Sequence, residues 1–228
     1  MRVSGRNVVA SGVLVLVAGA ALVGCGSGGG GGEASPSATS FDTLATTALV
    51  TKQEVTAIAG EGFEPYDSEA TASAADPAEC LELLRLADGT RTAPPATASS
   101  ATRSYARGST GASITNTVHV LVDDAKADEV YDHLASLVPT CKDFTVVVGS
   151  GVLKASIVKA KTASAGERSL GLRVVITSPT QKSDVTTVVA QQGRTLVVGV
   201  AGTPDGADEA DWAAQTAQVS AQKAASIT

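Results

Sequence analysis

The chain has 228 residues, of which 43% are apolar, 18% charged and 3% aromatic. The apolar fraction excludes a fully disordered chain, and the length suits one globular domain or at most two small ones. A formal net charge of −6 argues against nucleic acid as a partner, because phosphate binding requires a basic surface.

The N-terminus has the pattern of an exported lipoprotein. Two arginines precede an apolar run, Val8 to Val23, which is shorter than the roughly 20 residues that span a bilayer as a helix. The run ends in residues 22–25, whose sequence LVGC resembles the bacterial lipobox. In that pattern the cysteine receives a diacylglyceryl group and the leader is cut just before it. The resemblance implies a signal peptide over residues 1–24 and a lipid anchor on Cys25, at the extracytoplasmic face of the cell membrane. The alternatives are an ordinary cleaved leader and an uncleaved membrane anchor.

Residues 25–40 are predicted to form a flexible tether, because the glycine run within them cannot bury apolar surface. We therefore expect a single domain over residues 41–228. Its two cysteines, Cys80 and Cys141, are predicted to form a disulfide, since an exported chain folds in an oxidising compartment. No C-x-x-C motif and no nearby histidine supports a metal site or a catalytic thiol, so no metal and no other cofactor is expected.

Two helices are predicted early in the domain. Residues 51–59 open with the capping-box pattern TKQE and stop before Gly60. A second helix is expected from Asp76-Pro77 to Asp88-Gly89, with Cys80 and three apolar residues at helical spacing. Residues 92–100, with the sequence TAPPATASS, are predicted to be an exposed loop.

The rest of the domain alternates with a period of two, apart from two helices. Short connections between consecutive strands imply hairpins and hence antiparallel pairing. The predicted fold class is α+β, with an antiparallel sheet of five to six strands flanked by helices that cover one face. The expected strands are residues 113–122, 144–148, 152–159, 170–177, 185–190 and 195–200, and residues 102–106 are a possible further strand. The helices run from Asp123 to Val138 and from about Asp208 to the end.

Candidate catalytic residues have simpler structural explanations. A Ser-His-Asp hydrolase would need His119 or His133, yet the chain has no G-x-S-x-G motif, and the alternation of strand 113–122 places His119 on a solvated face. The carboxylates of residues 123–132 and 205–211 suit helix caps and a wet helix face better than a catalytic pair or a calcium loop. Trp212 is expected to be a packing anchor. We predict no catalytic residues and no enzyme.

Four stretches of the domain carry a family resemblance: residues 49–55 (LVTKQEV), Cys80, residues 127–144 with their Cys-x-x-Phe ending, and the strand-turn-strand-helix of residues 188–227. They resemble actinobacterial lipoproteins that share an extracellular sensor-like domain with mycobacterial membrane serine/threonine kinases. The resemblance implies an antiparallel sheet flanked by helices, a cleft for an unknown ligand, and no catalytic residues.

The sequence therefore predicts a non-enzymatic cell-surface lipoprotein that binds an unknown small ligand or an envelope protein. One alternative is a carrier of lipid or glycolipid in the envelope, which would need a large dry cavity under the sheet. A further alternative is an envelope hydrolase that uses His119 or His133.

Overall fold

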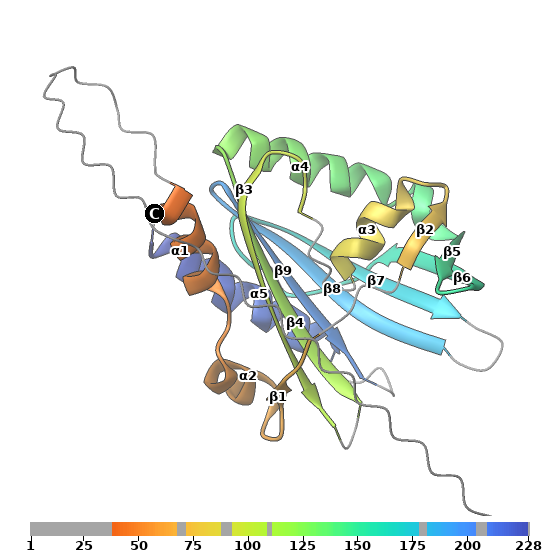
Figure 1. The fold of residues 1–228 in the computed structure, drawn as a ribbon, viewed down its shortest axis with the longest axis horizontal. Helices are drawn as coiled ribbons and strands as arrows, with labels where there is room; N and C mark the ends of the chain where they lie inside the picture. Colours follow the sequence, from red (N-terminus) through yellow and green to blue (C-terminus); the bar gives the residue numbers. More distant parts are fainter. Residues whose placement is uncertain are drawn as a thin grey trace, which may run out of the picture. The chain divides into compact units, whose positions relative to one another are not determined.

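The computed structural model describes residues 38–67, 72–87, 93–108, 111–177, 182–203 and 209–227, arranged as Figure 1 shows. Their strands form one antiparallel nine-stranded sheet in the order β1-β3-β4-β9-β8-β7-β6-β5-β2. The strands are β1 (Glu64–Pro65), β2 (Ala72–Asp76), β3 (Thr97–Arg107), β4 (Ala112–Leu121), β5 (Phe144–Val148), β6 (Gly151–Lys159), β7 (Arg168–Thr177), β8 (Lys182–Gln192) and β9 (Thr195–Gly202). The helices are α1 (Ala38–Ala48), α2 (Lys52–Ala59), α3 (Cys80–Ala87), α4 (Asp124–Leu137), α5 (Glu209–Ala225) and the short 3-10 helix η1 (Thr140–Lys142).

Two of the predicted helix starts are confirmed, whereas the start expected at Asp76-Pro77 is wrong, because Asp76 ends β2 and α3 begins at Cys80. The Thr51 hydroxyl accepts the Glu54 N–H, and the Glu54 carboxylate accepts the Thr51 N–H at 2.6 Å, which completes the capping box of α2. This helix ends at Gly60 with φ 84°, a left-handed conformation that glycine adopts at little cost. Helix α4 begins at Asp123, whose Oδ1 accepts the Lys126 N–H at 2.7 Å. Short polar side chains thus set both starts.

Helices cover both faces of the sheet, so the prediction that they cover one face is wrong. Helices α3 and α4 pack on the face that we call the inner face, and α1, α2 and α5 pack on the opposite, outer face. Consecutive residues of β9 divide between the two cores: Val198 lies in the inner core and Val197 in the outer core. Every residue of β9 is buried, because a central strand covered on both faces has no solvated side.

The sheet has nine strands, not the five to six expected. The two short edge strands β1 and β2 were not predicted, and β3 includes residues 97–100, which were expected to be a loop. β2 and residues 97–100 are rich in Ala, Ser and Thr, and β1 is only Glu64–Pro65, so all three segments carry weak intrinsic strand signals. They become strands because they pair with stronger neighbours: β2 with β5, and β3 with β4.

Helix α1 was also not predicted, and it begins at Ala38, inside the expected tether. Three hydrogen bonds hold its C-terminal end. The Ser220 hydroxyl donates to the Ala48 carbonyl at 2.7 Å, Lys223 Nζ donates to the Leu49 carbonyl at 2.6 Å, and the Val50 N–H donates to Asn116 Oδ1 at 2.9 Å. In the part of the chain that the structure describes, none of the helices has the length and apolar character needed to cross a membrane.

Candidate functional site

A groove of about 290 Å³ separates helices α3 and α4 on the inner face of the sheet. Its floor and walls are mainly apolar, and charged side chains occupy its rim. The apolar lining residues are Leu86, Ala93, Pro94, Pro95, Val130 and Leu134, and the rim residues are Glu82, Arg85, Glu129 and His133. A mainly apolar hollow with a few polar groups at its edge has the usual composition of a ligand site.

The two walls of the groove come from amphipathic helices. Leu83 and Leu84 of α3 are buried in the inner core, as are Val130 and Leu134 of α4, so each helix is fixed by its apolar side. The remaining wall is the segment that leads into β3, beginning at Ala93, whose side chain is exposed. The expected end of α3 at Asp88-Gly89 lies outside the described residues.

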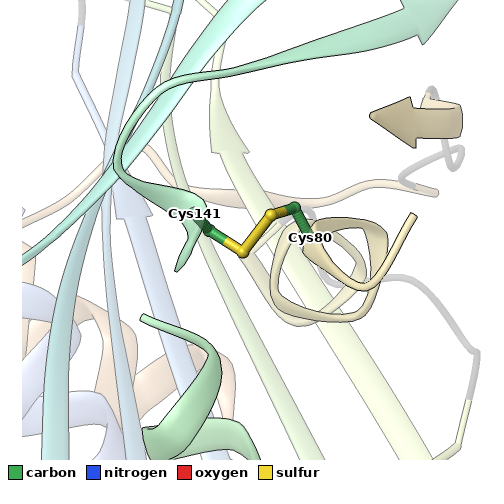
Figure 2. The surroundings of a disulfide bond; sticks show 2 residues. All are labelled: Cys80 and Cys141. Atoms are coloured by element: carbon green, nitrogen blue, oxygen red, sulfur yellow. A yellow bond between two sulfur atoms is a disulfide. The ribbon is translucent and has the colours of Figure 1, made fainter. Parts of the chain in front are cut away.

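Cys80 and Cys141 form a disulfide that joins the two walls covalently. Cys80 begins α3, and Cys141 lies in η1, just after α4 ends (Figure 2). Their Cα atoms are 5.5 Å apart, within the range that a disulfide requires, and both residues are fully buried. The bridge therefore restrains the short helix α3 relative to α4.

A polar contact spans the groove at its rim. His133 Nε2 lies 2.9 Å from Glu82 Oε2, and both side chains are about half exposed. His133 comes from α4 and Glu82 from α3, so the pair links the two walls on the side open to solvent. An exposed pair of this kind stabilises the fold little, but it offers a ligand one donor and one acceptor.

A second polar feature runs along the inner face of β3 and β4. Three directly opposed residue pairs are hydrogen-bonded side chain to side chain, at 2.9, 3.0 and 2.9 Å: Ser100–His119, Thr102–Thr117 and Ser104–Thr115. We call these six residues the polar ladder. A hollow of about 280 Å³ lies beside it, lined by Pro65, Tyr66, Asp67, Thr102, Arg103 and Ser104.

His119 is buried, so the prediction that it lies on a solvated face is wrong. Its exposed fraction is 1%, and burial lowers the pKa of its imidazole from 6.5 to about 4. The Ser100 hydroxyl lies 2.9 Å from Nδ1, which is the contact a hydrolytic Ser-His pair would make. Among the described residues, however, no carboxylate bonds to Nε2 to orient the ring. Strand β4 carries polar side chains on one side and mainly apolar side chains on the other, but the side chains on both sides are buried.

The burial of His119 predicts a loss of stability in mild acid. The unfolded chain binds a proton on this imidazole below pH 6.5, whereas the folded chain does so only near pH 4. We expect the free energy of unfolding to fall by about 2 kcal/mol from about pH 7 to about pH 5. Denaturant titrations at both pH values measure this difference. A His119→Gln variant retains His133 and should lose most of the pH dependence; an unchanged dependence would show that another group causes it.

The other candidates from the sequence have structural roles or lie outside the described residues. Asp128 and Asp132 on α4 bind Arg168 of β7 as ion pairs at the surface. Trp212 packs edge-to-face on Phe63 with ring centroids 5.9 Å apart, as expected of a packing anchor. Cys25 and the carboxylates of residues 205–208 lie outside the described residues. Within those that are described, no group of three or more His, Cys, Asp or Glu side chains could hold a metal ion.

Comparison with known proteins shows a likeness of fold. No protein-family model matches the chain, and no curated protein matches it. The extracellular domain of PknH from Mycobacterium tuberculosis superposes with a TM-score of 0.61 at 11% identity, covering 82% of this chain and 95% of that domain. A putative uncharacterized protein from Mycobacterium smegmatis gives a TM-score of 0.41 at 16% identity, covering 75% of this chain and 95% of that one. The PknH match confirms, at the level of the fold, the resemblance predicted from the sequence.

Proposed function

We propose that this chain is a non-enzymatic lipoprotein, anchored through Cys25 at the extracytoplasmic face of the cell membrane, whose domain binds a ligand or an envelope protein in the α3–α4 groove. The leader pattern supports the anchor, and the likeness to an extracellular domain supports the placement. Replacing Cys25 by serine is expected to abolish the incorporation of labelled fatty acid into the chain.

The observation that carries the binding role is the groove itself. It combines apolar walls with a polar rim, and the Cys80–Cys141 bridge restrains the two helices that form it. A site whose walls are held in place before binding loses less conformational entropy when a ligand arrives. The disulfide would therefore serve recognition as well as stability.

The two alternative functions have less support. A lipid carrier would need a large dry cavity under the sheet, but apolar side chains of α3, α4 and the strands fill the inner core, and the groove lies between the helices. A hydrolase could use the Ser100–His119 contact, but it would also need a group to orient the imidazole. We therefore propose neither.

Blocking the groove tests the binding role. Ala93 lines the groove with an exposed side chain, so an Ala93→Trp substitution can fill the groove without disturbing either core. We expect wild-type protein from an exporting host to carry a bound molecule in its native mass spectrum, and the variant to carry at least about tenfold less. An Ala163→Trp substitution at another exposed alanine should leave the bound molecule in place. Equal loading of all three proteins would refute binding in the groove.

A further inference from the structure

The edge of the sheet along β3 is only partly paired. The two residues of β1 pair with Ala106 and Tyr105, and the Tyr66 N–H donates to the Ser104 carbonyl at 3.1 Å. For the backbone of residues 99–102, the described part of the chain provides no hydrogen-bond partner on this side of β3. We call residues 99–102 the open edge.

The backbone groups of the open edge that point away from the sheet belong to Ser100 and Thr102. In an antiparallel pair, successive residues direct their N–H and C=O groups alternately toward one neighbouring strand and away from it. The Ser104 carbonyl points away from β4, because it accepts the Tyr66 N–H. The backbone groups of Thr102 and Ser100, at alternate positions before it, therefore also point away from β4. They offer two N–H donors and two carbonyl acceptors to an incoming chain.

The open edge lacks the features that usually prevent another strand from joining a sheet. Such edges commonly carry a charged residue, a proline or a bulge. Residues 99–102 have the sequence SSAT, with neither charge nor proline, and their register with β4 is regular. By contrast, β2 at the opposite edge has five residues, a register shift after Ala72 and a terminal Asp76. Ser100 is also exposed, so an incoming strand can reach this part of β3.

A hollow at one end of the open edge can accept a side chain of such a strand. The hollow of about 280 Å³ beside the polar ladder is lined by Tyr66 and Asp67, which follow β1, and by Thr102 and Ser104 of β3. Tyr66 lies opposite Ser104, so its ring is on the inner face and is 38% exposed. A residue opposite Thr102 would place its side chain on the same face, between the phenol ring and the hydroxyls. This hollow suits an amphipathic side chain.

An unneutralised carboxylate lies at the other end of the open edge. Asp42 of α1 accepts a hydrogen bond from the Ser99 hydroxyl, which places its carboxylate on the outer side of β3. Asp42 is exposed, and among the described residues no cation pairs with it. A basic side chain opposite Ser99 would lie within reach of this carboxylate, and the net charge of −6 also favours a basic partner.

We propose that the open edge binds an extended peptide segment of another protein, which adds a strand to the sheet in line with β1. The peptide backbone pairs with Ser100 and Thr102, an amphipathic side chain enters the hollow beside Tyr66, and a basic side chain three residues away binds Asp42. The partner is a polypeptide because an extended backbone supplies acceptors and donors at the spacing of the open edge. The hollow shares no lining residue with the α3–α4 groove, so this site is separate from the one proposed there.

Selection from a library of random peptides tests the proposal. Peptides selected on the purified chain are expected to share a basic residue and to slow hydrogen exchange at the Ser100 and Thr102 amides. Thr102→Pro removes an N–H that pairing with β4 does not use, at an edge position where proline is tolerated, and should weaken binding at least about tenfold. Thr102→Val loses the same hydroxyl contact with Thr117 but keeps the N–H, so its binding should stay within about threefold of wild type.

A second pair of variants tests the side-chain contact. Asp42→Asn should weaken the selected peptides about fivefold and remove most of the salt dependence of their binding. Asp143→Asn makes the same change of charge at another exposed aspartate, after η1, and should leave binding within about twofold. Equal effects of the two substitutions would show that Asp42 does not contact the peptide.

Four further results would overturn the proposal. They are a selection that yields no binding peptide, a Thr102→Pro variant that binds no more weakly than Thr102→Val, peptide protection of α3 and α4 in place of β3, and a dimer whose Ser100 and Thr102 amides are protected before peptide is added. Protection of α3 and α4 would instead support binding in the groove, so the two proposals are tested separately. Thermal unfolding shows whether each variant is folded. If Thr102→Pro is not folded, Ser100→Pro removes the other outward N–H and takes its place.

Discussion

A chain in which Cys80 and Cys141 are both replaced by alanine is expected to lose about 4 kcal/mol of its free energy of unfolding. The bridge joins residues separated by 61 positions, so removing it restores the conformational freedom of a long loop to the unfolded chain. Typical domains have a stability of about 5–15 kcal/mol, so this loss is a large part of the total. Denaturant titration of both proteins measures it.

The position of the bridge adds a local expectation. Helix α3 has eight residues and depends on tertiary contacts, because isolated helices of that length are not stable. Hydrogen exchange in the double variant should therefore accelerate more in α3 than in α5, which lies on the other face of the sheet. A loss below about 1 kcal/mol, or uniform acceleration in both helices, would contradict the role assigned to the bridge.

Gly199→Ala is expected to destabilise the domain by about 3 kcal/mol. Helix α5 crosses β9 so closely that a Cβ at this position would lie 2.4 Å from the Ala213 carbonyl oxygen and 2.9 Å from the Ala217 nitrogen. Both contacts are with backbone, which can yield only if the helix moves away from the sheet. The small side chains of Ala213 and Ala217, together with the absence of a side chain at Gly199, allow α5 to lie this close to β9.

Gly108→Ala is the matched control for this prediction. A Cβ at Gly108 has no neighbour within 4 Å, and its backbone is not in the left-handed region. Alanine there should leave stability within about 0.5 kcal/mol of the wild-type value. Denaturant titrations of the two variants compare the same chemical change with and without a close helix, and equal effects would show that the approach of α5 is not tight.

The elements predicted correctly are those with a local signal. The capping box at Thr51, the Asp123 cap and Pro139 define helix ends through interactions within a few residues. Hairpins such as β5–β6 combine β-branched runs with a short turn that contains glycine. These features can be predicted without knowing which elements pack against one another in the folded domain.

The predictions that were wrong concern features that depend on tertiary contacts. β2 has the sequence ASAAD, which shows no strand preference, and it joins the sheet only because the edge of β5 is available. The polar side of β4 suggested solvent, but the hydroxyls of β3 pair with it and bury His119. The second covered face did have a signal in the sequence: β9 reads TLVVGVAG, a run without polar alternation, as in strands buried on both sides.

The family resemblance implied a cleft, but the place and the residues of the groove could not be predicted, because its walls come from segments far apart in the chain. His133 lies 51 positions from Glu82, and neither residue shows a functional signal in its own surroundings. Only the expected disulfide indicated that α3 and the end of α4 lie together.

A crystal structure of the domain, purified from an exporting host without refolding, tests the central claim most directly. The account predicts electron density for a bound molecule in the α3–α4 groove, with its apolar part against Val130 and Leu134 and a polar atom within hydrogen-bond distance of His133 or Glu82. A groove that contains only water, together with a bound molecule elsewhere on the domain, would contradict it.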